Sequence, residues 1–178
     1  GFSLDSAGSL FAALDEVMGM TAEEIRACGL KLRETYAADK VASGDWPEDS
    51  AVERSRMEYE SLLPQGRDTP GHYLHAIVGF DGATVGTIWF AVKDQGKDRI
   101  AYVYDVTVSP EHQRQGHAFR AFLAVEAEAR RLGLAGIGLH VLGHNTGAQA
   151  LYAKLGYVPT HINLYKPLAP EGAVSRPK

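Results

Sequence analysis

The sequence predicts a single mixed α/β domain, and three observations lead to this prediction. The chain has 178 residues, of which 45% are hydrophobic and 22% charged, a composition that suits one globular domain. Two β-rich runs, residues 73–80 and 85–92, are joined through Asp81-Gly82, which predicts an antiparallel hairpin. The segments that follow alternate as strand, helix, strand, helix and strand, so a β-sandwich or a helix bundle is excluded.

Two helices precede the hairpin. Thr21-Ala22-Glu23-Glu24 has the form of a capping box, and the helix that it begins ends at Gly44. A second helix runs from about Glu48 until Pro64 stops it. A loop rich in turn-forming residues then leads to the first strand.

The third strand covers residues 100–108. Strict alternation places five apolar or aromatic side chains on one face, and these are Ile100, Tyr102, Tyr104, Val106 and Val108. Asp105 and Thr107 then share the opposite face.

The C-terminal half adds two helices and two strands. The first helix covers residues 117–132 and ends at Gly133, and a buried strand over residues 136–142 follows it. Asn145 caps a short helix that ends at Gly156, and residues 157–166 are expected to form the last strand.

Charge and composition exclude several classes of protein. The formal charge of −4 and the absence of a block of Lys or Arg argue against nucleic-acid binding. A single cysteine, Cys28, cannot form a disulfide within the chain, and the seven histidines show no clustered ligand spacing, so no metal is expected. No apolar run is long enough for a membrane span or a signal peptide, which favours a cytoplasmic protein.

The chain is expected to divide into three parts. Residues 1–19 begin with Gly rather than Met and are interpreted as an engineered or extra N-terminal segment. Residues 20–167 form the single folded domain, and residues 168–178 form a loose C-terminal tail.

The segment between the third strand and the following helix has the character of an anion site. It reads Gln113-Arg114-Gln115-Gly116-His117-Ala118, and a turn of this kind directs backbone N–H groups to a helix N-terminus, where the helix dipole favours negative charge. It lacks the Lys and Ser/Thr of a nucleoside-triphosphate loop. Taken alone, the segment fits an ordinary strand-to-helix turn equally well.

Two motifs in the correct order resemble those of the GCN5-related N-acetyltransferase (GNAT) family. The family's phosphate turn, Gln/Arg-x-x-Gly-x-Gly/Ala, is matched by Gln113, Gly116 and Ala118. Its later pattern, Asn-x-x-Ala-x-x-x-Tyr-x-x-x-Gly-Phe/Tyr, is matched by Asn145, Ala148, Tyr152, Gly156 and Tyr157. The resemblance covers about residues 20–167, and residues 63–72 look like a bacterial subgroup of the family.

The resemblance implies a GNAT-type fold and a coenzyme A site. The fold is a mixed, mostly antiparallel sheet with helices on both faces, splayed between the strands at residues 100–108 and 136–142. It further implies that acetyl-coenzyme A is the co-substrate, with pantetheine and pyrophosphate contacts at Val106, Val108, Gln113, Arg114, Gln115, Gly116, His117, Ala118 and Asn145. Asn145 is also a good helix cap in its own right.

Two residues are candidates for the acid and the base of the reaction. Tyr152 lies at the family's usual general-acid position, from which a phenol can protonate the leaving thiolate, but it also fits a core tyrosine. Asp105 lies beside the expected splay point, where a carboxylate can accept a proton from an amine directly or through water. A structural hydrogen-bonding Asp, or a His or water as the base, are the alternatives.

The acceptor pocket is less well specified. Imidazoles titrate near neutrality, so His72 and His140 are further candidates, and Trp46, Tyr59, Glu60, Tyr73 and Trp89 are possible lining residues or simply core. The predicted function is transfer of acetyl to a primary amine of a small molecule or peptide. The alternative is a coenzyme A-binding sensor without turnover. The identity of the amine and the oligomeric state, monomer or homodimer, stay open.

Overall fold

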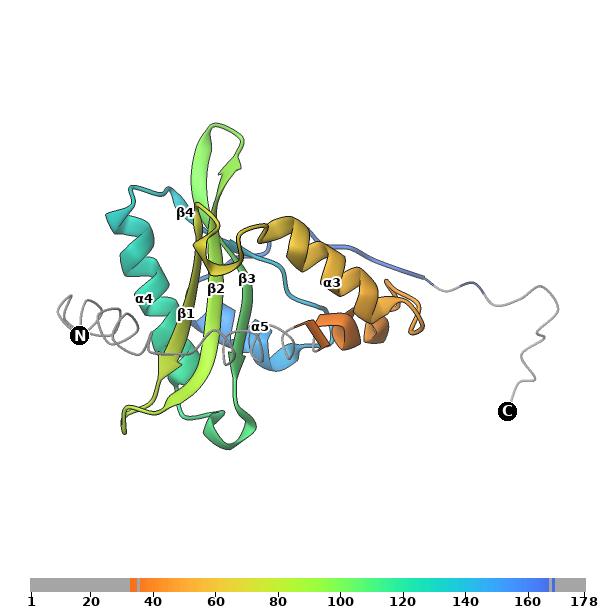
Figure 1. The fold of residues 1–178 in the computed structure, drawn as a ribbon, viewed down its shortest axis with the longest axis horizontal. Coiled ribbons are helices and arrows are strands. Elements are labelled where there is room, and N and C mark those ends of the chain that lie inside the picture. Colours follow the sequence, from red (N-terminus) through yellow and green to blue (C-terminus); the bar gives the residue numbers. More distant parts are fainter. Residues whose placement is uncertain (1–32, 35, 167, 169–178) are drawn as a thin grey trace.

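A computed structural model describes residues 33, 34, 36–166 and 168 of the chain (Figure 1). Residues 1–19 lie outside these residues, so the structure does not test their interpretation. The start of the first predicted helix, with its capping box and Cys28, also lies outside them. The described part of that helix ends at residue 42, close to Gly44, as predicted.

The centre of the fold is a four-stranded sheet with the order β1-β2-β3-β4. Its strands are β1 (His72–Val78), β2 (Thr84–Gln95), β3 (Asp98–Val108) and β4 (Gly136–Leu139). The first three are antiparallel neighbours, and β4 pairs with β3 in parallel. The predicted mixed, mostly antiparallel sheet is therefore confirmed, and Asp81-Gly82 forms the hairpin turn, in which Gly82 has φ +82°.

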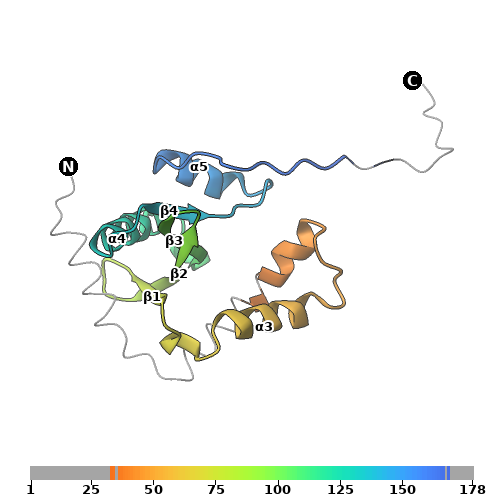
Figure 2. The same cartoon turned by 90° about the horizontal axis from the view of Figure 1, so that it is seen from above.

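Helices cover both faces of the sheet, as the family resemblance implied (Figure 2). On one face lie α3 (Ala51–Leu62) and the helix that ends at residue 42. The other face carries α4 (His117–Arg131) and α5 (Thr146–Lys154). Short 3₁₀ turns, η1 (Gly66–Asp68) and η2 (Pro110–His112), join these layers.

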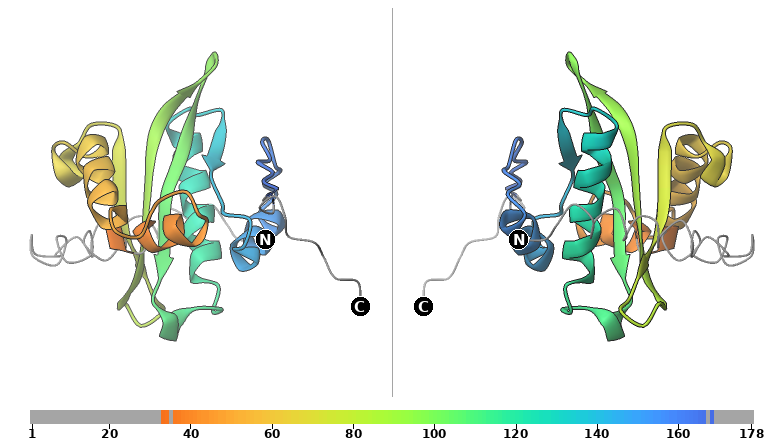
Figure 3. Two further views of the ribbon diagram at one scale, coloured as in Figure 1. Left: turned by 90° about the vertical axis from the view of Figure 1, so that its right-hand side faces the viewer. Right: turned by 90° about the vertical axis from the view of Figure 1, so that its left-hand side faces the viewer.

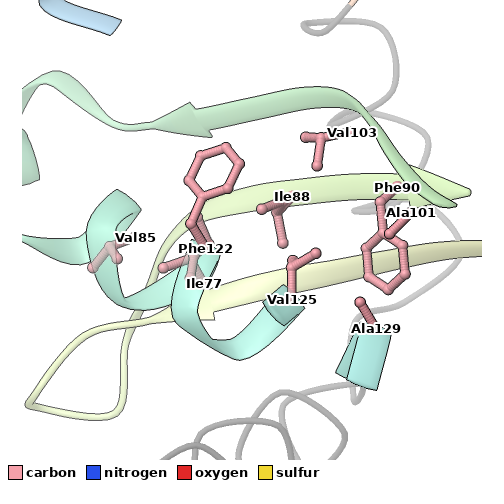
Figure 4. Packing of buried hydrophobic residues seen from close by; sticks show 10 residues of the cluster. Ile77, Val85, Ile88, Phe90, Ala101, Val103, Phe122, Val125 and Ala129 are labelled. Atoms are coloured by element: carbon pink, nitrogen blue, oxygen red, sulfur yellow. The ribbon is translucent and has the colours of Figure 1, made fainter. Parts of the chain in front are cut away.

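The main core lies between α4 and the sheet (Figure 4). Phe122, Val125 and Ala129 on one face of α4 pack against Ile88 and Phe90 of β2. These side chains recur at the spacing of one helix face, so the amphipathic pattern of the helix positions its N-terminus against the sheet. The helix begins at the same end of the sheet as the β1–β2 turn (Figure 3).

A β-bulge in β3 corrects the predicted face of that strand. Trp89 and Phe90 of β2 pair with Asp105 and Val103, so Tyr104 is an extra residue without a partner on β2. The bulge shifts the alternation of side chains by one residue. The five predicted side chains therefore do not share a face: Val106 and Val108 pack in the main core, whereas Tyr104 packs on the α3 side.

Strand β4 is shorter and less buried than predicted. It pairs with β3 only from Ile100↔Gly136 to Val103↔Leu139, and all four of its residues are half-buried. Beyond Leu139 the two strands separate, so residues 140–142 have no ladder partner. The splay that the family resemblance implied is confirmed.

The predicted last strand is not formed. Tyr157 packs in the main core, but residues 158–166 have no strand assignment. Their larger apolar side chains are exposed, with Val158 at 77% and Leu164 at 92%. A strand needs a neighbour for its backbone hydrogen bonds, and no described strand pairs with this segment.

No helix in the described ranges combines the length and the apolar character that crossing a membrane requires.

Candidate active site

The separation of β3 from β4 leaves one edge of β3 open. Ser109 N donates to Val85 O on β2 at 2.9 Å, and backbone groups of successive residues point to opposite edges of a strand. Val106 and Val108 therefore direct their N–H and C=O groups toward the open edge. The Val108 carbonyl already accepts from Gln113 Nε2 at 3.0 Å, so Val106 and the Val108 N–H remain for a ligand.

The turn that follows β3 and η2 has the backbone shape of an anion site. Arg114 and Gly116 both adopt left-handed conformations, with φ of 63° and 84°. Gly116 is the N-cap of α4, and no side chain caps the first N–H groups of this helix. A 15-residue helix with uncapped N–H groups at the open end of the sheet can accept a phosphate there.

Two side chains of the predicted phosphate turn donate hydrogen bonds to the backbone of the same loop. Gln113 Nε2 donates to Val108 O, and Gln115 Nε2 donates to Glu111 O at 3.0 Å. These bonds tie the loop before Gly116 to the end of β3 and to η2. The contribution of Gln113 and Gln115 is therefore to position the backbone, while Arg114 is exposed.

The structure adds Arg120 to the residues around this turn. Its Nη2 lies 2.7 Å from His117 Nδ1, its Cζ lies 4.0 Å from the ring centroid of Phe80, and its Nη1 lies 3.7 Å from the position of a Cβ on Gly116. Within the described ranges no carboxylate forms an ion pair with it. The family motif does not include position 120. Because residues four places apart share one face of a helix, Arg120 lies one turn after Gly116 on the same face.

His117 is almost fully buried, at 3% exposed. Burial lowers the pKa of His117, and the nearby charges of Arg120 and His112 lower it further. A neutral imidazole here accepts from Arg120 and so fixes the guanidinium beside the turn.

Tyr152 lies on α5 with its ring in the main core. It packs edge-on against Phe122, with ring centroids 5.3 Å apart, and 5.7 Å from Tyr157. Burial raises the pKa of the Tyr152 phenol, and the charge of Asp105 raises it further. Tyr152 is therefore protonated at neutral pH. The structure thus combines both readings of this residue, a packed ring and a protonated hydroxyl near Asp105.

Asp105 is half-buried at the bulge, where β3 leaves β4. Burial raises the pKa of Asp105 to about 6, and the charge of Asp39 adds to this, while the hydrogen bond from Thr107 Oγ1 at 3.1 Å opposes it. A carboxylate with this pKa is ionised at neutral pH and is more basic than an ordinary Asp. Such a group is suited to accept a proton.

An aromatic cluster lies on the α3 side of the sheet, next to Asp105. We call it the α3-side aromatic cluster, and its members are Tyr36, Trp46, Tyr59, His72, Trp89, Tyr102 and Tyr104. Trp89 is the cross-strand partner of Asp105, and its ring stacks on Tyr104 with centroids 4.6 Å apart. Trp89 Nε1 donates to His72 Nδ1 at 3.1 Å, and burial lowers the pKa of His72.

Other predicted residues lie elsewhere. Tyr73 stacks on Phe90 at 4.8 Å in the main core, on the opposite face from His72. Glu60 is held in an exposed ion pair with Arg56 at 2.7 Å, and His140 is exposed just beyond β4. The structure does not bring these three together with Asp105.

Asn145 caps α5, as predicted. Its Oδ1 accepts from Ala148 N at 3.1 Å, which leaves its amide N–H groups as donors at the end of the loop from β4. In the described part of the chain, no group of three or more His, Cys, Asp or Glu side chains could hold a metal ion.

Comparison with known proteins agrees with this geometry. The profile of the acetyltransferase (GNAT) family matches residues 33–157. The chain is similar to an uncharacterised N-acetyltransferase of Bacillus subtilis (strain 168), YdgE, with 33% identity over 84% of this chain and 95% of that protein. A mycothiol acetyltransferase from Nocardia farcinica is 28% identical over 68% of this chain and 38% of its own length.

A solved structure shows the same fold. The crystal structure of the acetyltransferase YycN from Bacillus subtilis is 30% identical, covers 84% of this chain and 96% of its own, and has a TM-score of 0.78. One explanation accounts for the open edge of β3, for the two family motifs and for the turn at residues 113–118, which we call the anion turn. The chain belongs to the GNAT family and is an N-acetyltransferase.

Proposed function

We propose that this protein transfers the acetyl group of acetyl-coenzyme A to a primary amine by direct attack. What supports the proposal is that Asp105 lies where β3 leaves β4 and that its charge raises the pKa of the Tyr152 phenol on α5. In this proposal a base and an acid act at the same opening in the sheet, with the anion turn at its end.

The chain's own residues fit coenzyme A. The backbone of Val106 and the Val108 N–H would bond the pantetheine amides, and the N–H groups at residues 116–118 would bind the pyrophosphate. Arg120 would add a fixed positive charge, because no described carboxylate pairs with it. Asn145 keeps its amide donors for the same ligand. When bound, coenzyme A supplies the acetyl group as a thioester.

Asp105 and Tyr152 divide the proton transfers between them. The free amine attacks the carbonyl carbon, a C–N bond forms, and the C–S bond breaks. Asp105 takes the proton that the nitrogen loses, and Tyr152 gives its proton to the departing sulfur. Solvent then returns a proton to Tyr152 and removes one from Asp105, so the net products are an amide and a thiol.

The paired environments of these two residues favour catalysis over simple cofactor binding. A pure coenzyme A sensor needs the anion turn and the open strand edge, but it has no use for a carboxylate whose pKa is raised to about 6 beside a protonated phenol.

Thiol release from acetyl-coenzyme A, screened against polyamines, amino acids, aminoglycosides and peptide N-termini, tests the proposal. We expect turnover with at least one class, and loss of that turnover in the Asp105→Asn, Tyr152→Phe double variant. Tight coenzyme A binding without turnover on any amine would instead support the sensor.

A further inference from the structure

One of the chain's own ammonium groups rests on the α3-side aromatic cluster. Lys93 Nζ lies 4.5 Å from the ring centroid of Tyr102 and 5.5 Å from that of Tyr104. Its side chain is exposed, and within the ranges that the structure describes it forms none of the ion pairs. The ring faces attract an alkylammonium group electrostatically, so this contact stabilises the ammonium.

A second ammonium group lies at the other end of the cluster. Lys40 Nζ lies 5.8 Å from the Tyr36 ring centroid and 5.9 Å from that of Trp46, while Asp45 Oδ2 holds it in an ion pair at 2.9 Å. Edge-on and tilted ring contacts connect Tyr36 through Tyr59 to Trp89, which lies against Tyr104. The cluster thus has a cation at each end, and the rings of Tyr59 and Trp89 that connect the two ends are buried.

Lys93 belongs to β2, but the two tyrosines that its ammonium contacts lie on β3, the strand that carries Asp105. Tyr102 contacts Tyr104 edge-on at 5.0 Å, and Tyr104 is the residue directly before Asp105. Tyr104 and Tyr102 come one and three residues before Asp105, so at about 3.3 Å per residue they lie roughly 3–10 Å from it along the backbone. A molecule with two amino groups on a short aliphatic chain fits that separation.

We infer that the acceptor carries two cationic groups. This inference rests on the proposed function and names its substrate class. One ammonium replaces that of Lys93 on the faces of Tyr102 and Tyr104, while the other amine lies at Asp105, loses its proton there and is acetylated. Lys93 is then an internal competitor for the cation site. Free diamines and basic peptides share this chemistry.

Turnover of matched acceptors tests the inference. The probes are 1,5-diaminopentane, 5-amino-1-pentanol, which replaces one amino group by a hydroxyl, and a Lys-Lys dipeptide with blocked termini. We expect the wild-type protein to have a higher kcat/KM for a dicationic acceptor than for the amino alcohol. Preference for the diamine would identify small polyamines, and preference for the dipeptide would identify basic peptides.

Variants of Lys93 and Tyr102 test whether the preference for a dicationic acceptor comes from the cation site on Tyr102 and Tyr104. Lys93→Met removes the competitor, so the preference for the dication is expected to rise about two- to fivefold through KM. Lys93→Arg retains a cation on the rings and should leave the preference as in the wild type. Tyr102→Leu should abolish the preference, whereas Tyr102→Phe keeps the ring face and should retain it.

Calorimetric binding of 1,5-diaminopentane and of the dipeptide separates this inference from the proposed function. If acetyl transfer is found but the dications have no advantage and Lys93→Met changes nothing, the cation site is wrong and the function stands. If no amine is acetylated but a dication binds in a way that depends on Tyr102, the cation site stands and the function is wrong. Binding that is indifferent to Lys93 and Tyr102 overturns the cation site.

Discussion

Trp89 Nε1 donates a hydrogen bond to His72 Nδ1 at 3.1 Å, and this bond fixes the state of the imidazole. Nδ1 must be the acceptor, so a neutral His72 carries its proton on Nε2. Burial lowers the pKa of His72, and a donor to Nδ1 favours the neutral ring as well. His72 is therefore a neutral donor at pH 7 within the α3-side aromatic cluster.

Trp89→Phe is expected to raise the pKa of His72 toward its ordinary value. The substitution keeps an aromatic ring against Tyr104 but removes the indole N–H, and loss of one hydrogen bond should reduce stability by about 1 kcal/mol, apart from any loss of packing. Titration of the imidazole nitrogens by NMR measures the change. Trp46→Phe alters the same cluster without touching His72, so an equal pKa rise in that variant would contradict the role of the indole.

The raised pKa of Asp105 predicts the pH dependence of activity. Wild-type kcat/KM should rise through about pH 6 as Asp105 ionises, and this inflection should be absent in Asp105→Asn. The defect of the variant should shrink at higher pH, because more of the amine arrives already deprotonated. A pH-independent defect would indicate that Asp105 is structural.

The same pKa predicts that Asp105 lowers stability at neutral pH. Its folded pKa of about 6 lies above the ordinary 3.8, so between these values the unfolded chain binds fewer protons and stability falls as the pH rises. Asp105→Asn should therefore be more stable than the wild type at pH 7, by about 1–3 kcal/mol. Thermal or urea unfolding at pH 4 and pH 7 checks this, since the difference should shrink toward pH 4.

Tyr152→Phe separates the hydroxyl from the ring. The ring contacts with Phe122 and Tyr157 are kept, so stability should change by about 1 kcal/mol or less. Loss of the general acid should lower kcat by about 10²–10⁴-fold, with coenzyme A affinity nearly unchanged. Steady-state kinetics and calorimetry measure the two quantities, and a wild-type kcat would remove Tyr152 from the mechanism.

Gly116→Ala is expected to weaken coenzyme A binding by at least about tenfold, because the backbone approaches the phosphate at a left-handed residue. The added Cβ would lie 3.7 Å from Arg120 Nη1, so it meets no clash within the protein. The strain itself costs about 1–2 kcal/mol of stability.

Gly133→Ala is the matched control for this strain. Gly133 has φ +68° at the other end of α4, with nothing within 4 Å of an added Cβ. Both variants should lose similar stability, but only Gly116→Ala should lose affinity in calorimetry. If Gly116→Ala binds coenzyme A as tightly as Gly133→Ala does, the turn at Gly116 does not bind the phosphates.

The proposed cofactor side of the site could be predicted from the sequence because it depends on local patterns. A turn with glycine before an amphipathic helix, and an Asn cap three residues before Ala148, form from neighbouring residues, and both are found where the motifs place them. The order of strands and helices follows from hydrophobic periodicity in the same way. A local motif could not predict the place of Arg120, because its partners His117 and Phe80 come from two different elements.

The acceptor side depended on contacts between distant segments. Strict alternation along β3 cannot reveal the bulge, because the extra residue at Tyr104 exists only relative to its partner strand β2. The length of β4 likewise depends on a neighbour, because β4 ends where β3 leaves it. Residues 158–166 have the sequence of a strand but no described strand to pair with. The residue types and their local turns were thus determined by the sequence by itself. Only the tertiary structure decided which side chains face Asp105, because burial, pKa shifts and cross-strand contacts arise when separate elements pack together.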